Sequence, residues 1–202
     1  MKKEVISAKT LEEAKNLACE KLNASLDELV ISEKEVKTGL FNKKVEIVAI
    51  TKSELNKYIK DYITELVRNI GINVNIETKV NEGIPTFNII TDQSSILIGR
   101  NGRTIEALQN ITSQMIYLEL NTYYKFIIDV SDYKRKRTIR LEKLAKYTAK
   151  DVARSKMPVN LEPMNSYERR IIHNALNNSK DVITESEGEE PNRYVVIKPK
   201  EE

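Results

Sequence analysis

The sequence predicts an α+β protein made of three small, consecutive modules. Helix-like stripes of apolar residues alternate with short strand-like segments along the whole chain, which is typical of mixed α and β folds. The 202 residues are 40% hydrophobic and 31% charged, which suits one to three globular domains. No internal repeat or low-complexity linker separates the segments. We therefore expect closely spaced modules at 1–51, 52–131 and 132–202.

The first module is predicted to be a β-α-β-β unit. EVISA supplies the first strand, and the helix after it starts with Thr10 and Glu13 at the spacing of a capping box. Apolar residues at helical spacing should form its buried face: Leu11, Ala14, Leu17, Ala18 and Leu22. ELVISEKEVK and KKVEIVAI supply the other strands. Between them, Leu40 and Phe41 are expected to fold back on the core, and a contact surface is the less favoured alternative.

The second module is predicted to follow the order α-β-β-α-α-β. KSELNKYIKDYITELVRNIG carries a helical stripe that ends at Gly71, and INVNIETKV alternates apolar and polar residues as a strand does. IPTFNIIT and TYYKFIIDVS are further strands. DQSSILI is expected to form a short helix. The helix after Gly102 keeps one apolar face, formed by Ile105, Leu108, Thr112 and Met115.

The third module begins with a long basic helix that Pro158 is expected to end. Its inward stripe is predicted to be Leu141, Leu144, Ala145, Thr148, Ala149 and Val152. NSYERRIIHNAL forms a second helix capped by Asn165 or Ser166. VNLEPM is a short strand or extended piece, and DVITES and RYVVIKP are strands.

Charge is distributed unevenly, although the net charge of +3 is too small to imply a polyanionic partner by itself. Ten basic residues lie between Lys134 and Lys156, and only Glu142 and Asp151 oppose them. The segment is predicted to be an electrostatic track for a polyanion, with a solvated helix face as the alternative. Its expected contacts are Lys136, Arg140, Lys143 and Lys150.

Several classes of protein are disfavoured by composition. Cys19 is the only cysteine, which excludes an internal disulfide framework and a cysteine zinc cluster. No transmembrane segment is expected because no apolar stretch approaches the ~20 residues of a membrane span, and the first residues lack the apolar core that is typical of a signal peptide. We expect a cytoplasmic protein without metal or cofactor. An enzyme acting on nucleotides is disfavoured, since there is neither a P-loop nor a carboxylate cluster.

Two glycines in ILIGRNGRTIEAL separate an apolar run from the start of a helix. Gly99 and Gly102 permit positive φ and close approach of a ligand, while the helix N-terminus favours anions. Arg100 and Arg103 add positive charge. The segment is therefore predicted to bind a sugar-phosphate backbone, and a plain helix-connecting turn is the alternative.

The order of elements around these glycines resembles a type II KH domain, whose G-x-x-G loop clamps about four nucleotides of a single strand. The resemblance implies that Gly99, Arg100, Asn101 and Gly102 form the loop and that Ile98 lines a groove for bases. No aromatic residue lies beside the loop, so affinity should depend on main-chain contacts and apolar packing.

Arg169 and His173 are four residues apart, so they share one face of NSYERRIIHNAL, the second helix of the third module. A lone histidine is more often a satisfied core or surface residue. However, MNSYERRIIHNALNNSKDVITESEGEEPNRYVVIKP resembles the R-x-x-x-H (R-three-H) domain, a small fold that binds single-stranded nucleic acid. The resemblance implies that both side chains lie on an exposed face and contact phosphate or base.

A type II KH unit followed by an R-x-x-x-H unit is similar to the bacterial Jag (SpoIIIJ-associated) RNA-binding proteins. EVKTGLFNKK corresponds to a glycine-containing turn in the Jag-N module of that family. The resemblance implies a non-enzymatic protein that grips single-stranded RNA, with single-stranded DNA as an alternative. It also implies a role in post-transcriptional regulation linked to the cell envelope or cell division.

The resemblance further implies protein partners. These are a second copy of the chain, a small protein with a single KH domain, or a protein associated with the membrane insertase. An alternative interpretation makes the chain an adaptor that docks a protein through the Jag-N module, with RNA binding secondary.

Overall fold

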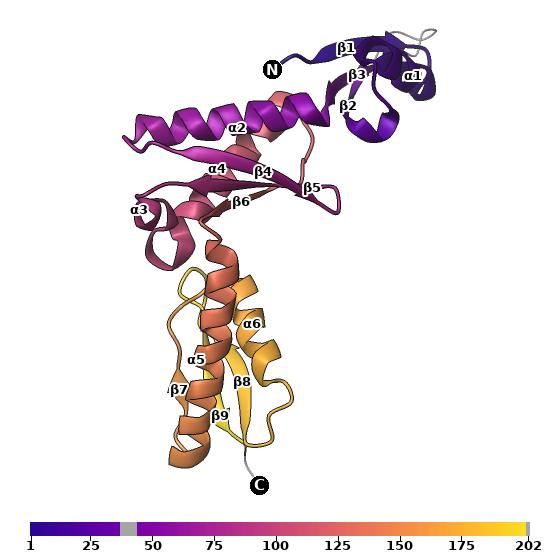
Figure 1. The fold of residues 1–202 in the computed structure, drawn as a ribbon. Helices are drawn as coiled ribbons and strands as arrows, with labels where there is room; N and C mark the ends of the chain where they lie inside the picture. Colours follow the sequence, from indigo (N-terminus) through magenta and orange to yellow (C-terminus); the bar gives the residue numbers. More distant parts are fainter. Residues whose placement is uncertain (37–43, 201–202) are drawn as a thin grey trace. The chain divides into compact units, whose positions relative to one another are not determined.

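The computed structural model describes residues 1–36 and 44–200, so the predicted packing of Leu40 and Phe41 lies outside the described residues. The chain divides into two compact units, Met1–Ser131 and Asp132–Glu202. The described strands form three three-stranded sheets, each covered by helices (Figure 1). The predicted α+β class is confirmed, and the division into three modules stays a prediction. Among the described helices, none is long and apolar enough to cross a bilayer.

The first sheet has the strand order β1-β3-β2, and its neighbours are antiparallel. Its elements are β1 (Glu4–Ala8), α1 (Leu11–Leu22), β2 (Leu29–Val36) and β3 (Lys44–Thr51). The Thr10 hydroxyl caps α1 by accepting a hydrogen bond from the Glu13 N–H at 3.1 Å. The Glu13 carboxylate accepts from the Lys9 N–H and not from that of Thr10, so the reciprocal bond of the predicted capping box is displaced by one residue.

The second sheet has the order β4-β5-β6 and follows the predicted sequence of elements. Those elements are α2 (Lys52–Asn69), β4 (Asn75–Asn81), β5 (Ile84–Ile90), α3 (Ser94–Ile98), α4 (Arg103–Leu120) and β6 (Ile127–Val130). β6 runs parallel to β5, and a parallel neighbour needs a crossover connection. The segment from α3 to α4 provides that crossover, so the Gly99–Gly102 turn lies between two helices.

The third sheet, in the second unit, has the order β7-β9-β8 and is antiparallel. The elements are α5 (Tyr133–Ser155), β7 (Val159–Asn160), α6 (Ser166–Leu176), β8 (Val182–Glu187) and β9 (Tyr194–Pro199). α5 packs on β9 and α6 packs on β8 (Figure 1). Their shared core includes Leu141, Ala145, Val152, Ile172, Val195 and Ile197.

Two details of α5 differ from expectation. The helix ends at Ser155, where Lys156 adopts a left-handed conformation with φ of 58°, so the stop precedes Pro158 by three residues. Leu144 was predicted to face inward and is instead 42% exposed. At about 100° per residue, Leu144 lies at the edge of the stripe, while Leu141 and Ala145 point to the core.

Candidate nucleic-acid interface

The Gly99–Gly102 turn has a backbone that side chains would strain. Gly99 has φ of 69° and ψ of −177°, a region that is essentially restricted to glycine. Asn101 and Gly102 are left-handed, with φ of 53° and 80°. The Gly99 N–H donates to the Ser95 carbonyl at 2.9 Å and closes α3. The two glycines therefore let the chain end α3 at Ile98 and start α4 at Arg103, with four residues between the two helices.

Gly99 is also required by packing inside the turn. A Cβ added there would lie 2.1 Å from Thr104 Oγ1 and 2.9 Å from Thr104 Cβ. From the sequence, the glycine at this position is predicted to let a ligand approach the backbone closely. The structure adds a second reason, since the Thr104 side chain already fills that space.

Positive charge surrounds the turn. Arg100 and Arg103 are exposed, and neither forms an ion pair with the residues that the structure describes. Arg103 is the first residue of α4, an 18-residue helix that starts without a side-chain cap. The Arg103 N–H donates to the Arg100 carbonyl within the turn, and the partial positive charge of the helix end favours anions. The spot is therefore suited to phosphate.

The apolar run before the turn is divided between core and surface. Leu97 is buried, Ile98 is half-buried and Ile96 is 57% exposed. Ile98 was predicted to line a groove, but Ile96 offers more apolar surface to a ligand. Successive side chains of the short helix α3 are rotated by about 100°, which explains why Leu97 enters the core while Ile96 does not.

Arg169 and His173 lie together on α6, but both are partly buried and both are already hydrogen-bonded. The Arg169 side chain is 11% exposed, and its Nη2 donates to Glu190 Oε1 at 2.6 Å. The two ring nitrogens of His173 lie 2.6 Å from Thr184 Oγ1 and 2.8 Å from Ser186 Oγ. The resemblance implies an exposed face, whereas β8 and the loop after it partly cover both side chains.

The surroundings of His173 favour its neutral form. Burial lowers its pKa below the ordinary value of 6.5, and the charge of nearby Arg169 lowers that pKa further. A neutral imidazole has one donor and one acceptor nitrogen, and each hydroxyl can play either role. Thr184 and Ser186 can therefore satisfy both nitrogens. Sequence reasoning missed these partners, which lie in the TESEGEEPN segment.

The basic residues of α5 fall into two groups. Lys136, Arg140, Lys143 and Lys150 are exposed, as the predicted track requires. Arg137 instead turns inward, where its Nε lies 2.7 Å from Glu168 Oε1, and that carboxylate side chain is 7% exposed. Sequence reasoning had counted Arg137 with the other cations of the segment. Its role in the structure is to join α5 to α6.

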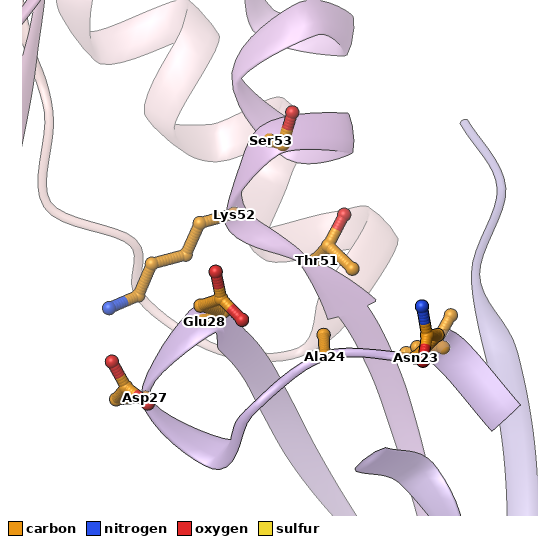
Figure 2. Close-up of a pocket in the computed structure, with 8 residues that line it drawn as sticks. Asn23, Ala24, Asp27, Glu28, Thr51, Lys52 and Ser53 are labelled. Atoms are coloured by element: carbon orange, nitrogen blue, oxygen red, sulfur yellow. The ribbon is translucent and has the colours of Figure 1, made fainter. Parts of the chain in front are cut away.

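A separate open pocket of about 470 Å³ has a different chemistry (Figure 2). It is lined by residues after α1 and at the start of α2, and the carboxylates of Asp27 and Glu28 face it. Hydrogen bonds from Ser25 lower the pKa of both groups, which keeps them charged. No predicted site residue lines the pocket, and its two carboxylates outnumber the ammonium group of Lys52, so the pocket is not part of the candidate interface.

Comparison with known proteins gives a consistent result. The family model of the R-three-H domain matches residues 139–199. RNA-binding protein KhpB of Clostridium symbiosum is 36% identical over 98% of this chain and 91% of its own length. The KhpB of Bacillus subtilis is 30% identical, with 80% and 79% covered. The KhpB of Lactiplantibacillus plantarum is 35% identical over 68% of this chain, which spans 42% of that relative's length.

Proposed function

Since the chain belongs to the Jag/KhpB family of RNA-binding proteins, we propose that it grips single-stranded RNA at two places. One is the Gly99–Gly102 turn, and the other is the face of α6 that carries Arg169 and His173. The activity is binding without catalysis, in post-transcriptional regulation linked to the cell envelope or cell division. The proposal includes modules at 1–51, 52–131 and 132–202.

The observation that carries the proposal is the turn before α4. Its backbone is held in a shape that only glycine adopts at Gly99, and it presents the N-terminus of an 18-residue helix. Two exposed arginines flank this helix end. Phosphate groups bind where main-chain N–H groups, a helix dipole and full positive charges converge.

Unpaired bases are the second element that the turn can receive. Ile96 exposes an apolar side chain directly before the turn, and Ile98 is half-buried beside it. Bases in a duplex are stacked and paired, so they cannot reach such a surface, whereas bases of a single strand can. This supports single-stranded RNA as the ligand class.

At the α6 face, an RNA phosphate binds by replacing the carboxylate that is paired with Arg169. Arg169 pairs with Glu190, which is 59% exposed, so a phosphate can replace that carboxylate without opening the core. Of the Thr184 and Ser186 hydroxyls beside His173, the one that accepts from the ring N–H keeps its own O–H as a further donor. Because both places lie on one chain, contact at one raises the effective concentration of the other.

The turn is tested by replacing Arg100 and Asn101 together with Asp. Asp tolerates the left-handed conformation of residue 101, so the fold should persist while like charge repels phosphate. We expect binding of an unstructured, fluorescently labelled RNA to weaken at least about tenfold, measured by anisotropy. The matched control is Ser53→Asp with Lys57→Asp, which makes the same change in net charge at two exposed positions of α2. Equal affinity of the two variants would reject the turn as a binding site.

The α6 face is tested with Arg169→Ala plus His173→Ala. Affinity should fall, with a shallower dependence on salt if Arg169 meets phosphate. Arg170→Ala plus Asn174→Ala changes two exposed residues of the same helix and serves as control. Thermal unfolding identifies a loss caused by misfolding, and Arg169→Lys keeps the charge. A titration that matches the wild type at every salt concentration would reject this face.

A further inference from the structure

One large aromatic side chain lies in the middle of the basic face of α5. Tyr147 is 69% exposed, whereas a tyrosine ring in a protein core buries a large apolar area. At about 100° per residue, it lies on the side of the helix opposite the buried Ala145 and Val152. It is therefore directed away from the core of its unit.

The same geometry aligns cations with this ring. Lys143 and Lys150 precede and follow Tyr147 by one turn, and Arg140 and Arg154 lie on the same face one turn further on each side. All four are exposed. Within the described part of the chain, Arg140, Lys143 and Lys150 form no ion pair, and Arg154 pairs with Asp151 at 3.3 Å. Positive charge thus lies on both sides of the ring along a helix roughly 35 Å long.

Another exposed tyrosine of the chain is different. Tyr123 is 84% exposed, but its ring lies 4.9 Å from that of Tyr117. Tyr147 has no aromatic partner among the residues that the structure describes. Leu144, one turn before it, is also exposed at 42%. Together they form a small apolar spot within the cationic face.

We propose that Tyr147 is a base-stacking site, on which a base of the bound RNA lies while Lys143 and Lys150 hold the adjoining phosphates. Aromatic rings between basic residues are how proteins bind single strands regardless of sequence, because every base has a π-face. The inference rests on the proposed RNA-binding function. It adds a third contact, one made to bases and separate from the turn and the α6 face.

An anionic membrane is the other polyanionic surface that a basic helix can meet. Helices that lie in a membrane surface need a broad apolar face, which enters the lipid. The apolar face of α5 is buried in the core of its unit, with Leu141, Ala145 and Val152 at most 1% exposed. The remaining spot of Tyr147 and Leu144 is suited to a single planar base.

The first test compares Tyr147→Ala with Tyr147→Phe in the full chain. We expect Tyr147→Ala to bind an oligouridine about tenfold more weakly, while Tyr147→Phe binds as the wild type does. The slope of log affinity against log salt should stay unchanged, since no charge is removed, whereas Lys143→Ala with Lys150→Ala should reduce it. Wild-type affinity in Tyr147→Ala would overturn the inference while leaving the proposed function intact. Failure of the wild-type protein to bind would overturn both.

The second test uses fluorescence, because the chain contains no tryptophan. Tyr147→Trp introduces a single indole, and Tyr123→Trp is the control at another exposed position, in the other unit. Oligouridine should quench the first variant strongly and the second weakly, and an abasic strand of equal charge should quench neither. Equal quenching by the abasic strand would overturn the inference. A blue shift with anionic vesicles and no response to RNA would also overturn it, in favour of a membrane.

Discussion

At the Gly99–Gly102 turn, the charged side chains are exposed and the backbone is fixed, whereas on α6 the charged side chain is partly buried and already paired. Arg100 and Arg103 have no ion-pair partner among the described residues. Arg169 pairs with Glu190, and His173 has a hydroxyl at each ring nitrogen. An anion meets no competitor at the first place and must displace a carboxylate at the second. Two short motifs of similar length are therefore expected to differ in the energetics of anion binding.

The largest expected effect comes from Gly99→Ala. The added methyl group overlaps Thr104 and strains a backbone with φ of 69°. We expect the free energy of unfolding to fall by about 3 kcal/mol, measured by urea denaturation. Gly83→Ala is the matched control, because Gly83 has φ of 76° with nothing within 4 Å and should cost about 1 kcal/mol. Equal costs at both positions would show that contact with Thr104 does not fix the turn.

Glu168→Ala tests whether internal ion pairs hold the α6 site. The change leaves the Arg137 guanidinium, 21% exposed, without its carboxylate partner at 2.7 Å. We expect a loss of about 2 kcal/mol in thermal or urea unfolding. Glu142→Ala removes an exposed carboxylate from α5 and should change stability by less than about 0.5 kcal/mol. Similar stabilities for the two variants would contradict a structural role for the pair.

Glu190→Gln sharpens the contrast between an open and an occupied site. Removal of the competing carboxylate should let Arg169 bind phosphate about two- to fivefold more tightly, measured by RNA titration at low salt. Glu189→Gln makes the same charge change one residue away and should have a smaller effect. Weaker binding by Glu190→Gln would mean that Glu190 holds Arg169 in position for RNA.

The smallest effect is a dependence of stability on pH. Because burial lowers the pKa of His173 in the folded state, the unfolded chain binds more protons once the pH falls below about 6.5. The free energy of unfolding should therefore decrease as the pH falls from 7.5 towards 5.5. His173→Gln should reduce this slope in thermal melts. An identical slope in both proteins would show that the imidazole does not lose solvation on folding.

The helices and their order could be predicted because each helix carries its own local signals. Asn165 is an example, since its side chain caps α6 by accepting a hydrogen bond from the Glu168 N–H at 3.0 Å. The contact of Arg169 with Glu190 could not be predicted, because the two residues meet only when the loop after β8 folds over α6. Arg137 could not be distinguished from the exposed cations of α5 either, because its partner Glu168 lies on another helix. The binding roles of the site residues stay predictions.

The close packing of Gly99 against the Thr104 side chain, which leaves no room for a Cβ, has a consequence for what can lie along the turn. Because Gly99 packs so closely against Thr104, we expect the turn to keep its shape when a nucleic acid binds. The nucleic acid must therefore bend to fit the turn. Bending costs little free energy for a flexible single strand and much more for a duplex, whose persistence length is about 50 nm. At the proposed binding site, a rigid turn would therefore discriminate against double helices without contacting a base.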